Sequence, residues 1–146
     1  MLTKSTEHAL RALVFIQLQN VEDKRPGVAE VAEGIKAPKA FLAKILQTLT
    51  KHNLLDSARG RGGGFFFNGN QADISLYDVI NVMEGDGSFH NCGFGFKNCT
   101  DESPCPIHHK YIKMRDEFQN IAKTETIESL SERILEGKAV LNSMFG

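Results

Sequence analysis

Three cysteines and one histidine form the most reactive cluster of residue types in this 146-residue chain. Cys92, Cys99 and Cys105 are its only cysteines, and His108 follows the last of them after two intervening residues. Thiolates and imidazole are ligands for zinc and for iron–sulfur clusters. An odd number of cysteines cannot all pair within one chain, which favours metal ligation or redox sensing over a structural disulfide. These residues alone leave three alternatives open: an iron–sulfur cluster, a zinc ion or redox-active thiols.

The distribution of charge separates the chain into a basic and an acidic half. Residues 1–70 contain ten Lys/Arg and six Asp/Glu, whereas residues 71–146 contain seven and twelve. A basic half indicates contact with a polyanion such as DNA. The sequence has no signal peptide and no apolar run long enough to cross a membrane, so a cytoplasmic protein is expected. No catalytic triad, carboxylate pair or nucleotide motif is present, and an enzyme is not expected.

The first half of the chain has the pattern of a helix-turn-helix. A helix over residues 5–19 precedes a short helix over residues 28–34, which Gly34 is expected to end. A longer helix begins near Pro38, and no acidic residue occurs from there to Lys51. Its shallow, basic face is suited to a major groove. We expect contacts from Lys39, Ala40 and Lys44, although the lysines can also be explained as an ordinary solvated face.

A glycine-rich segment follows this motif. Residues 54–58 and 65–67 are predicted strands, and the glycines between them permit a tight hairpin. The hairpin would form the wing of a winged helix, with Arg59 and Arg61 at its tip as further DNA contacts. A phosphate-binding loop is excluded because the required Gly-Lys-Ser/Thr is absent. A hairpin without a DNA role is the plain structural alternative.

The rest of the chain is expected to hold the cysteine site and to dimerise. Residues 74–83 form an amphipathic pattern, and a helix after the cysteines carries an apolar seam that suits a dimer. The alternative is a helix packed on its own domain. The seam comprises Ile107, Tyr111, Met114, Phe118 and Ile121. The predicted fold class is mostly α with a small β-hairpin wing. The expected parts are a DNA-binding domain (1–83), a cluster-binding loop (84–106), a dimerisation helix with a short capped helix (107–136) and a flexible tail (137–146).

This order of motifs resembles the IscR/NsrR-type winged-helix transcription regulators. The most specific part is the segment Arg59–Phe65, Arg-Gly-Arg-Gly-Gly-Gly-Phe, and the resemblance extends over about residues 2–130. The other matching segments are 2–4, 9–11, 31–33, 41–46, 52–55, 74–80 and the cysteine loop. The resemblance implies a bacterial homodimer on a palindromic operator. It also implies sensing of iron–sulfur status, redox state or nitric oxide through a cluster.

The same resemblance implies the ligands of that cluster. Cys92, Cys99 and Cys105 occupy the ligand positions, and His108 is the favoured fourth ligand. Glu7 of the partner subunit is the alternative, and His90 and His109 are weaker candidates. A 2Fe–2S cluster is favoured over a 4Fe–4S cluster. The spacing between Cys92 and Cys99 is one residue longer than is usual in these proteins, which leaves the cluster type open. A zinc-bound or cluster-free thiol protein of the same fold is the alternative function.

Overall fold

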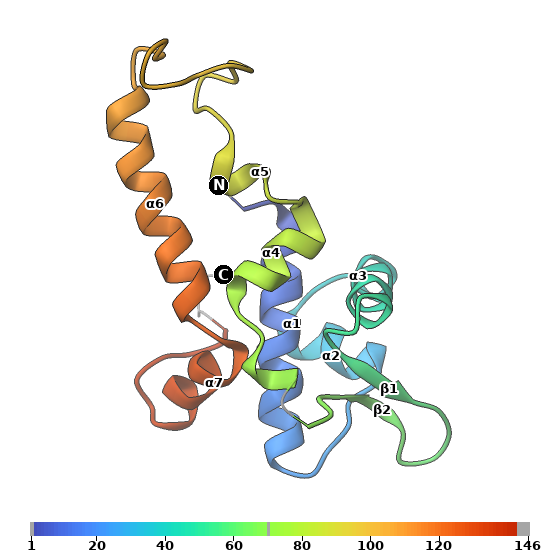
Figure 1. Cartoon of the computed structure of the whole chain (residues 1–146). Coiled ribbons are helices and arrows are strands. Elements are labelled where there is room, and N and C mark those ends of the chain that lie inside the picture. The colour runs from blue at the N-terminus through green and yellow to red at the C-terminus, as the bar shows by residue number, and fades with distance from the viewer. Residues whose placement is uncertain (1, 70, 143–146) are drawn as a thin grey trace.

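The computed structural model describes residues 2–69 and 71–142, and it confirms the predicted fold class. The described chain is mostly helical, with one antiparallel two-stranded hairpin (Figure 1). The elements are α1 (Lys4–Val21), α2 (Val28–Ile35), α3 (Lys39–Lys51), β1 (Asp56–Ala58), β2 (Gly64–Phe66), the 3-10 turn η1 (Gln71–Asp73), α4 (Leu76–Glu84), α5 (Gly87–His90), α6 (His108–Thr124) and α7 (Ile127–Leu135).

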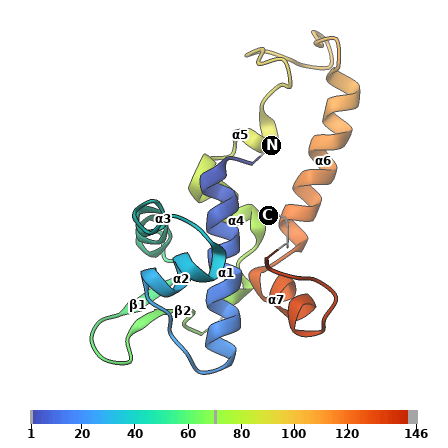
Figure 2. The same ribbon diagram turned by 180° about the vertical axis from the view of Figure 1, so that it is seen from behind.

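Helix α1 is the centre of the fold. It packs against α2, α3, α4 and α7, which surround it in Figures 1 and 2. Ala9, Ala12, Leu13 and Ile16 of α1 are fully buried. Burial of each large aliphatic side chain stabilises the fold by about 1.5–3 kcal/mol. The nearly all-apolar middle of this helix, already visible in the sequence, is therefore the core of the DNA-binding part.

The turn between α2 and α3 differs from the sequence-based prediction. Gly34 does not cap α2: the helix continues through Ile35, and Lys36 is the C-cap, with a left-handed φ of 57°. The N–H of Ala37 bonds to the carbonyl of Ala32 and closes this end of α2. Pro38 is the N-cap of α3. The turn therefore spans Lys36–Pro38. Gly34 lies inside α2 and is not part of its C-cap.

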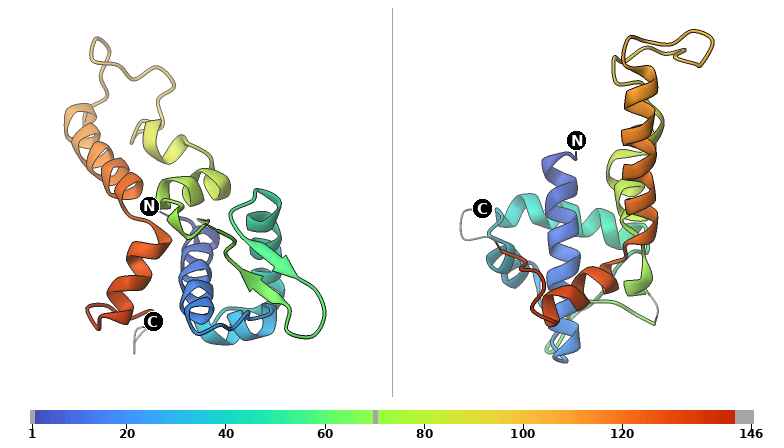
Figure 3. Two further views of the ribbon diagram at one scale, coloured as in Figure 1. Left: turned by 60° about the horizontal axis from the view of Figure 1, so that its bottom comes forward. Right: turned by 90° about the vertical axis from the view of Figure 1, so that its left-hand side faces the viewer.

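The hairpin is shorter than predicted but has the expected form. β1 and β2 pair antiparallel with Ser57 opposite Phe65. Its tip contains Gly60 and Gly62, whose φ values of 86° and 77° are ones that glycine adopts at little cost. The tip projects from the helical body in Figure 3. Leu55, which was expected in the first strand, precedes it and is fully buried in the core.

The cysteine loop joins α5 to α6 at the end of α6 remote from α7 (Figure 1). Phe89 of α5 is buried and stacks between Tyr77 of α4 and Phe118 of α6, at centroid distances of 4.7 and 5.3 Å. These three rings therefore fix the start of the loop against α4 and α6.

The predicted seam of α6 is divided between two sides of the helix. Phe118 packs inside the chain, and Tyr111 lines a cavity formed by the cysteine loop. Ile107, Met114 and Ile121 remain exposed, at 40%, 51% and 47%. Part of the seam therefore packs within its own chain, and three residues spaced by seven are left on the surface.

Thr126 is the N-cap of α7, since its side chain accepts a hydrogen bond from the N–H of Ser129. Beyond α7, Leu141 packs against the core and Asn142 donates a hydrogen bond to the carbonyl of Gly34. This part of the expected tail thus returns to α2, and residues 143–146 lie outside the described residues. In the part of the chain that is described, no helix has the length and apolar character needed to cross a membrane.

Candidate functional site

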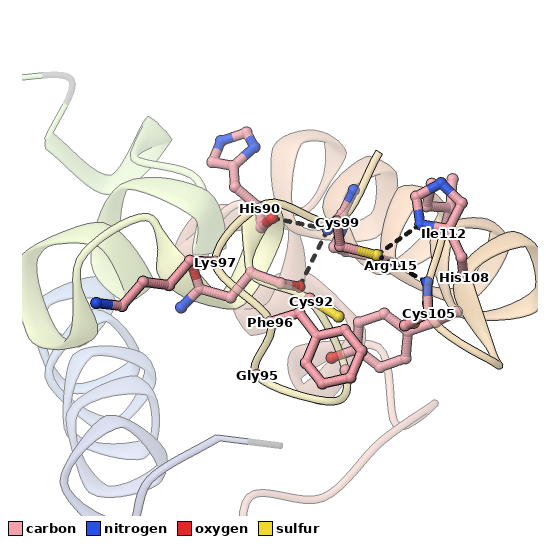
Figure 4. Close-up of a pocket in the computed structure, with 13 residues that line it drawn as sticks. His90, Cys92, Gly95, Phe96, Lys97, Cys99, Cys105, His108, Ile112 and Arg115 are labelled. Carbon is pink, nitrogen blue, oxygen red and sulfur yellow. Dashed lines mark hydrogen bonds between the residues drawn. The ribbon is translucent and has the colours of Figure 1, made fainter. Parts of the chain in front are cut away.

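The three cysteines converge at one cavity. The Sγ atoms of Cys92, Cys99 and Cys105 all lie within 4.8 Å of one another. Cys105 is buried and the other two are half-buried. Their cavity, of about 490 Å³, lies between the loop and the first turns of α6 (Figure 4). Folding thus brings together the three thiols that the sequence separates by loops of six and five residues.

Helix α6 holds the loop in place at this cavity. The guanidinium of Arg115 donates hydrogen bonds to the carbonyl oxygens of His90 and Asn91, at 2.8 and 3.0 Å. A side chain at Gly93 would overlap the ring of Tyr111, so glycine permits the loop to lie directly on the helix. These contacts place Cys92 opposite the start of α6, where Cys105 and His108 are located.

Backbone N–H groups point at two of the sulfur atoms. The N–H of Phe94 donates to Cys92 Sγ, and that of Cys105 donates to Cys99 Sγ, each at 3.4 Å. Burial raises the pKa of Cys92, but hydrogen bonds from the N–H groups of Phe94 and Phe96 outweigh it and lower the pKa to about 7. The N–H of Cys105 lowers the pKa of Cys99, but burial and the neighbouring sulfurs raise it above its ordinary value. Cys92 therefore ionises more readily than Cys99.

His108 lies beside the sulfurs at the start of α6. Its Nδ1 is 3.0 Å from Cys99 Sγ, and its Nε2 is 2.9 Å from Oδ1 of Asp101. The side chain of His108 is only 7% exposed, whereas that of Asp101 is 83% exposed. The histidine that the family resemblance implies as the favoured fourth ligand therefore faces Cys99. Asp101 was not predicted, because a loop acid in this sequence has no distinguishing pattern.

The weaker ligand candidates are placed differently. His90 lines the cavity at the end of α5, and its carbonyl is the group held by Arg115. His109 is exposed and packs edge-on against the ring of His108, at a centroid distance of 5.0 Å. Glu7 lies in the first turn of α1 and pairs with Lys4 at 3.6 Å. Among the described residues of one chain, close groups of donor atoms are formed by the three cysteines and by Asp101, His108 and His109, and Glu7 belongs to neither group.

The basic face of the chain is formed by α3 and the wing. Lys39, Ala40, Lys44, Arg59 and Arg61, the predicted DNA contacts, are all exposed. A groove of about 430 Å³ separates α3 from the hairpin and is lined by Ala43, Gln47, Thr50, Lys51, Ser57 and Phe65. Gln47 and Lys51 lie three and seven residues after Lys44. This spacing in the sequence already indicates that the three side chains share one face of the helix.

Arg25 was also missed by the sequence-based prediction. It precedes α2 in the sequence, but its guanidinium lies over the ring of Phe66 in β2, at 3.9 Å from the centroid. This adds an exposed cation at the base of the wing. A contact between a loop and a distant strand leaves no periodic pattern in the sequence.

A winged helix with a basic recognition helix and an arginine-tipped hairpin defines a class of DNA-binding proteins. The sequence profile of the Rrf2 family, described as an iron-dependent transcriptional regulator, matches residues 2–133. The chain therefore belongs to the Rrf2 family, and it is a transcriptional regulator with DNA as its partner. This confirms the resemblance found in the sequence and agrees with the expectation that the chain is not an enzyme.

Individual relatives support the same assignment. The regulator NsrR of Oceanobacillus iheyensis is 28% identical over 130 residues, which cover 88% of this chain and 88% of that protein. The structure of IscR from T. potens has a TM-score of 0.73 at 17% identity, covering 100% of this chain and 96% of that one. CymR, the global cysteine regulator of B. subtilis, has a TM-score of 0.73 at 17% identity, covering 90% and 96%. The two solved structures establish the similarity of the fold.

Proposed function

We propose that this regulator senses iron–sulfur status, redox state or nitric oxide through a cluster held by Cys92, Cys99 and Cys105. The observation that carries the proposal is the convergence of their Sγ atoms, each within 4.8 Å of the other two, at one cavity. The site lies in a chain whose other end is a DNA-binding winged helix. Such a site is suited to control DNA binding.

The donor set fits an iron–sulfur cluster. Thiolates are the usual ligands of such clusters, and imidazole replaces some of them in known cluster types. Nδ1 of His108 already faces Cys99 Sγ at 3.0 Å, and His108 is therefore the favoured fourth ligand. Glu7 of the partner subunit is the alternative. A 2Fe–2S cluster fits a Cys3His set best, with 4Fe–4S as the alternative. When bound, the cluster supplies a redox centre that is sensitive to oxidants and nitric oxide.

The α3 helix and the wing supply the DNA contacts in this proposal. The N-terminal turn of α3 would enter the major groove, where Ala40 permits close approach and Lys39 and Lys44 face phosphates. Arg59 and Arg61 at the wing tip would reach the adjacent minor groove and its phosphates. All five residues are exposed on the basic part of the chain.

The dimer contact in this proposal is the exposed stripe of α6, defined as Ile107, Met114 and Ile121. A second copy of the chain would bury these side chains in a two-helix seam. Two winged helices related by a two-fold axis would then contact the half-sites of a palindromic operator. The parts 1–83, 84–106 and 107–136 would act as DNA-binding, sensing and dimerising segments.

Arg115 provides the physical link between the site and the dimer. It lies on α6 and binds the loop at His90 and Asn91. Rearrangement of the loop would change these bonds, shift α6 and alter the spacing of the two recognition helices. A change in spacing weakens several DNA contacts at once, so the two states of the site would differ in operator affinity.

Anaerobic purification followed by iron, sulfide and zinc analysis tests the cofactor. We expect a brown protein with visible charge-transfer absorption and sulfide matched to iron. Fluorescence anisotropy with an operator selected from a random DNA library then tests the coupling. Equal affinities of the cluster-loaded and cluster-free forms would contradict the proposed sensing mechanism.

A thiol- or zinc-based regulator of the same fold is the second candidate. The observation that favours it is the hydrogen bond from the N–H of Phe94 to Cys92 Sγ at 3.4 Å, which helps to lower the pKa of this thiol to about 7. A lowered pKa makes a cysteine more reactive when no cluster is bound. Colourless anaerobic protein with stoichiometric zinc would support the zinc form. The thiol form would be supported if iodoacetamide alkylates Cys92 of the metal-free protein before the other cysteines. The operator affinity should then change in proportion to the fraction of Cys92 that is alkylated.

A further inference from the structure

His108 is held by a different partner at each ring nitrogen. Nδ1 lies 3.0 Å from Cys99 Sγ, and Nε2 lies 2.9 Å from Oδ1 of Asp101. The ring of His109 packs against the same imidazole in a T-shaped arrangement, at a centroid distance of 5.0 Å. The ring is buried, so its orientation is set by these contacts and not by solvent.

The two contacts are chemically unequal. An ionised carboxylate only accepts hydrogen bonds, whereas a neutral imidazole has one N–H and one bare nitrogen. A hydrogen bond from Nε2–H to Asp101 therefore requires the proton to be on Nε2. The lone pair of Nδ1 then points towards the sulfurs, in the form that a metal ligand needs.

We propose that Asp101 is a positioning residue that fixes His108 in the Nε2–H tautomer and so prepares Nδ1 as the fourth ligand of the cysteine site. This inference rests on the proposed function, because it assigns a role within the same site. Ligating histidines commonly donate their second N–H to a carboxylate, which orients the ring and increases its basicity.

The neighbouring acid provides a matched control. Glu102 is adjacent, exposed and equally charged, and within the described residues its side chain makes no hydrogen bond. Asp101→Ala and Glu102→Ala therefore remove the same charge from the same loop, but only the first removes the partner of Nε2. Since Asp101 is 83% exposed, its loss leaves no cavity in the core.

The first measurement uses the cluster-free protein. Nitrogen-15 NMR of the His108 ring, recorded with the imidazole neutral, distinguishes a protonated Nε2 from a protonated Nδ1. We expect the Nε2–H form in the wild type and in Glu102→Ala. In Asp101→Ala we expect a mixture or the Nδ1–H form, with Cys99 Sγ as the acceptor. Asp101→Glu should restore part of the wild-type pattern.

The second measurement uses the reconstituted protein. Loss of an outer carboxylate partner lowers metal retention by about 10- to 100-fold. We expect Asp101→Ala to release iron to a chelator about 10-fold faster than Glu102→Ala does. Its midpoint potential should also rise, because a less basic imidazole stabilises the oxidised form less well. A purely structural role for Asp101 would leave the potential unchanged.

The outcomes separate this inference from the proposed function. If Asp101→Ala matches Glu102→Ala in both ring nitrogen shifts and potential, the inference is overturned. If neither the wild type nor any variant retains iron and sulfide, the proposed cluster fails. The NMR comparison on the metal-free protein would still decide whether Asp101 sets the tautomer.

Discussion

Gly34 shows how one residue determines the packing of the helix-turn-helix on the central helix. A Cβ at this position would overlap the ring of Phe15 on α1. Gly34→Ala should therefore lower the free energy of unfolding by about 1–3 kcal/mol through overpacking. Urea denaturation followed by circular dichroism measures this change.

Introducing Gly34→Ala into the Phe15→Ala variant tests whether the contact with Phe15 causes this loss of stability. In Phe15→Ala the obstructing ring is absent, and adding the methyl group of Gly34→Ala should be neutral or stabilising. Alanine is favoured over glycine within a helix by up to about 1 kcal/mol. If Gly34→Ala costs as much in this background as in the wild type, the contact with Phe15 is not the reason for the glycine.

At the scale of elements, Glu84 connects the end of α4 to the start of α1. Its carboxylate accepts hydrogen bonds from the N–H of Thr3 and the hydroxyl of Ser88, both at 3.1 Å. Burial raises the pKa of Glu84, but hydrogen bonds from Thr6, Thr3 and Ser88 lower it below its ordinary value of 4.5. A negative charge at this place also stabilises the N-terminus of α1.

Glu84→Gln should reduce the free energy of unfolding by about 1 kcal/mol at neutral pH. Because the folded-state pKa is lowered, the contribution of Glu84 is complete above pH 4.5 and is lost as the pH falls through the lowered value. The difference from wild type should thus shrink in acid. Asp86→Asn is the control. It also removes one negative charge, but the side chain of Asp86, the N-cap of α5, makes no capping hydrogen bond. A difference that is independent of pH would exclude the charged interaction.

The wing allows a separate test of DNA binding. Arg59→Ala should weaken binding to the selected operator by about 1–3 kcal/mol if Arg59 enters a groove. Lys113→Ala removes an exposed cation from α6, away from the wing, and should leave the affinity almost unchanged. Fluorescence anisotropy measures both variants at one salt concentration. Equal affinities of the two variants would remove Arg59 from the DNA interface.

At the scale of the whole molecule, the apolar stripe of α6 determines the assembly that we propose. Met114→Glu places a charge in the middle of this stripe, where the side chain of Met114 is 51% exposed in the single chain. We expect the variant to sediment as a monomer and to lose most of its affinity for a palindromic site. Analytical ultracentrifugation measures the first effect, and anisotropy measures the second.

Asn120→Glu is the matched control for the dimer prediction. It adds the same charge at an exposed position of α6 that lies outside the stripe. This variant should remain dimeric and bind DNA as the wild type does. If both variants dimerise equally well, another surface of the chain must form the contact between subunits.

Helical periodicity explains which parts of the fold were predictable. The apolar spacing of α1 and α3 and the glycines of the hairpin identified the winged helix, because each pattern is local. The same local reasoning misplaced the end of α2. It assigned Gly34 to the cap, whereas Gly34 lies inside α2, against the ring of Phe15 on α1.

The seam of α6 shows the limit of a periodic pattern. Spacing identified Tyr111, Met114 and Phe118 as apolar positions of one helix. It could not show whether their side chains pack against a partner subunit or against α5 and the cysteine loop of the same chain. In the structure Phe118 packs against Phe89, and Met114 remains exposed. Which surface each side chain packs against depends on the path of the loop between α5 and α6, and residue spacing within a helix does not encode that path.

The sequence by itself determined the winged-helix class and the soft-ligand chemistry of Cys92, Cys99 and Cys105, because residue types and short-range spacing are sufficient for both. Only the tertiary structure decided that the three sulfurs meet and that His108 faces Cys99. It also placed Asp101 behind the imidazole. These arrangements depend on the cysteine loop, which hydrogen bonds from Arg115 hold against α6. The contacts join segments that have no repeating pattern in the sequence, so they are defined only in the folded chain.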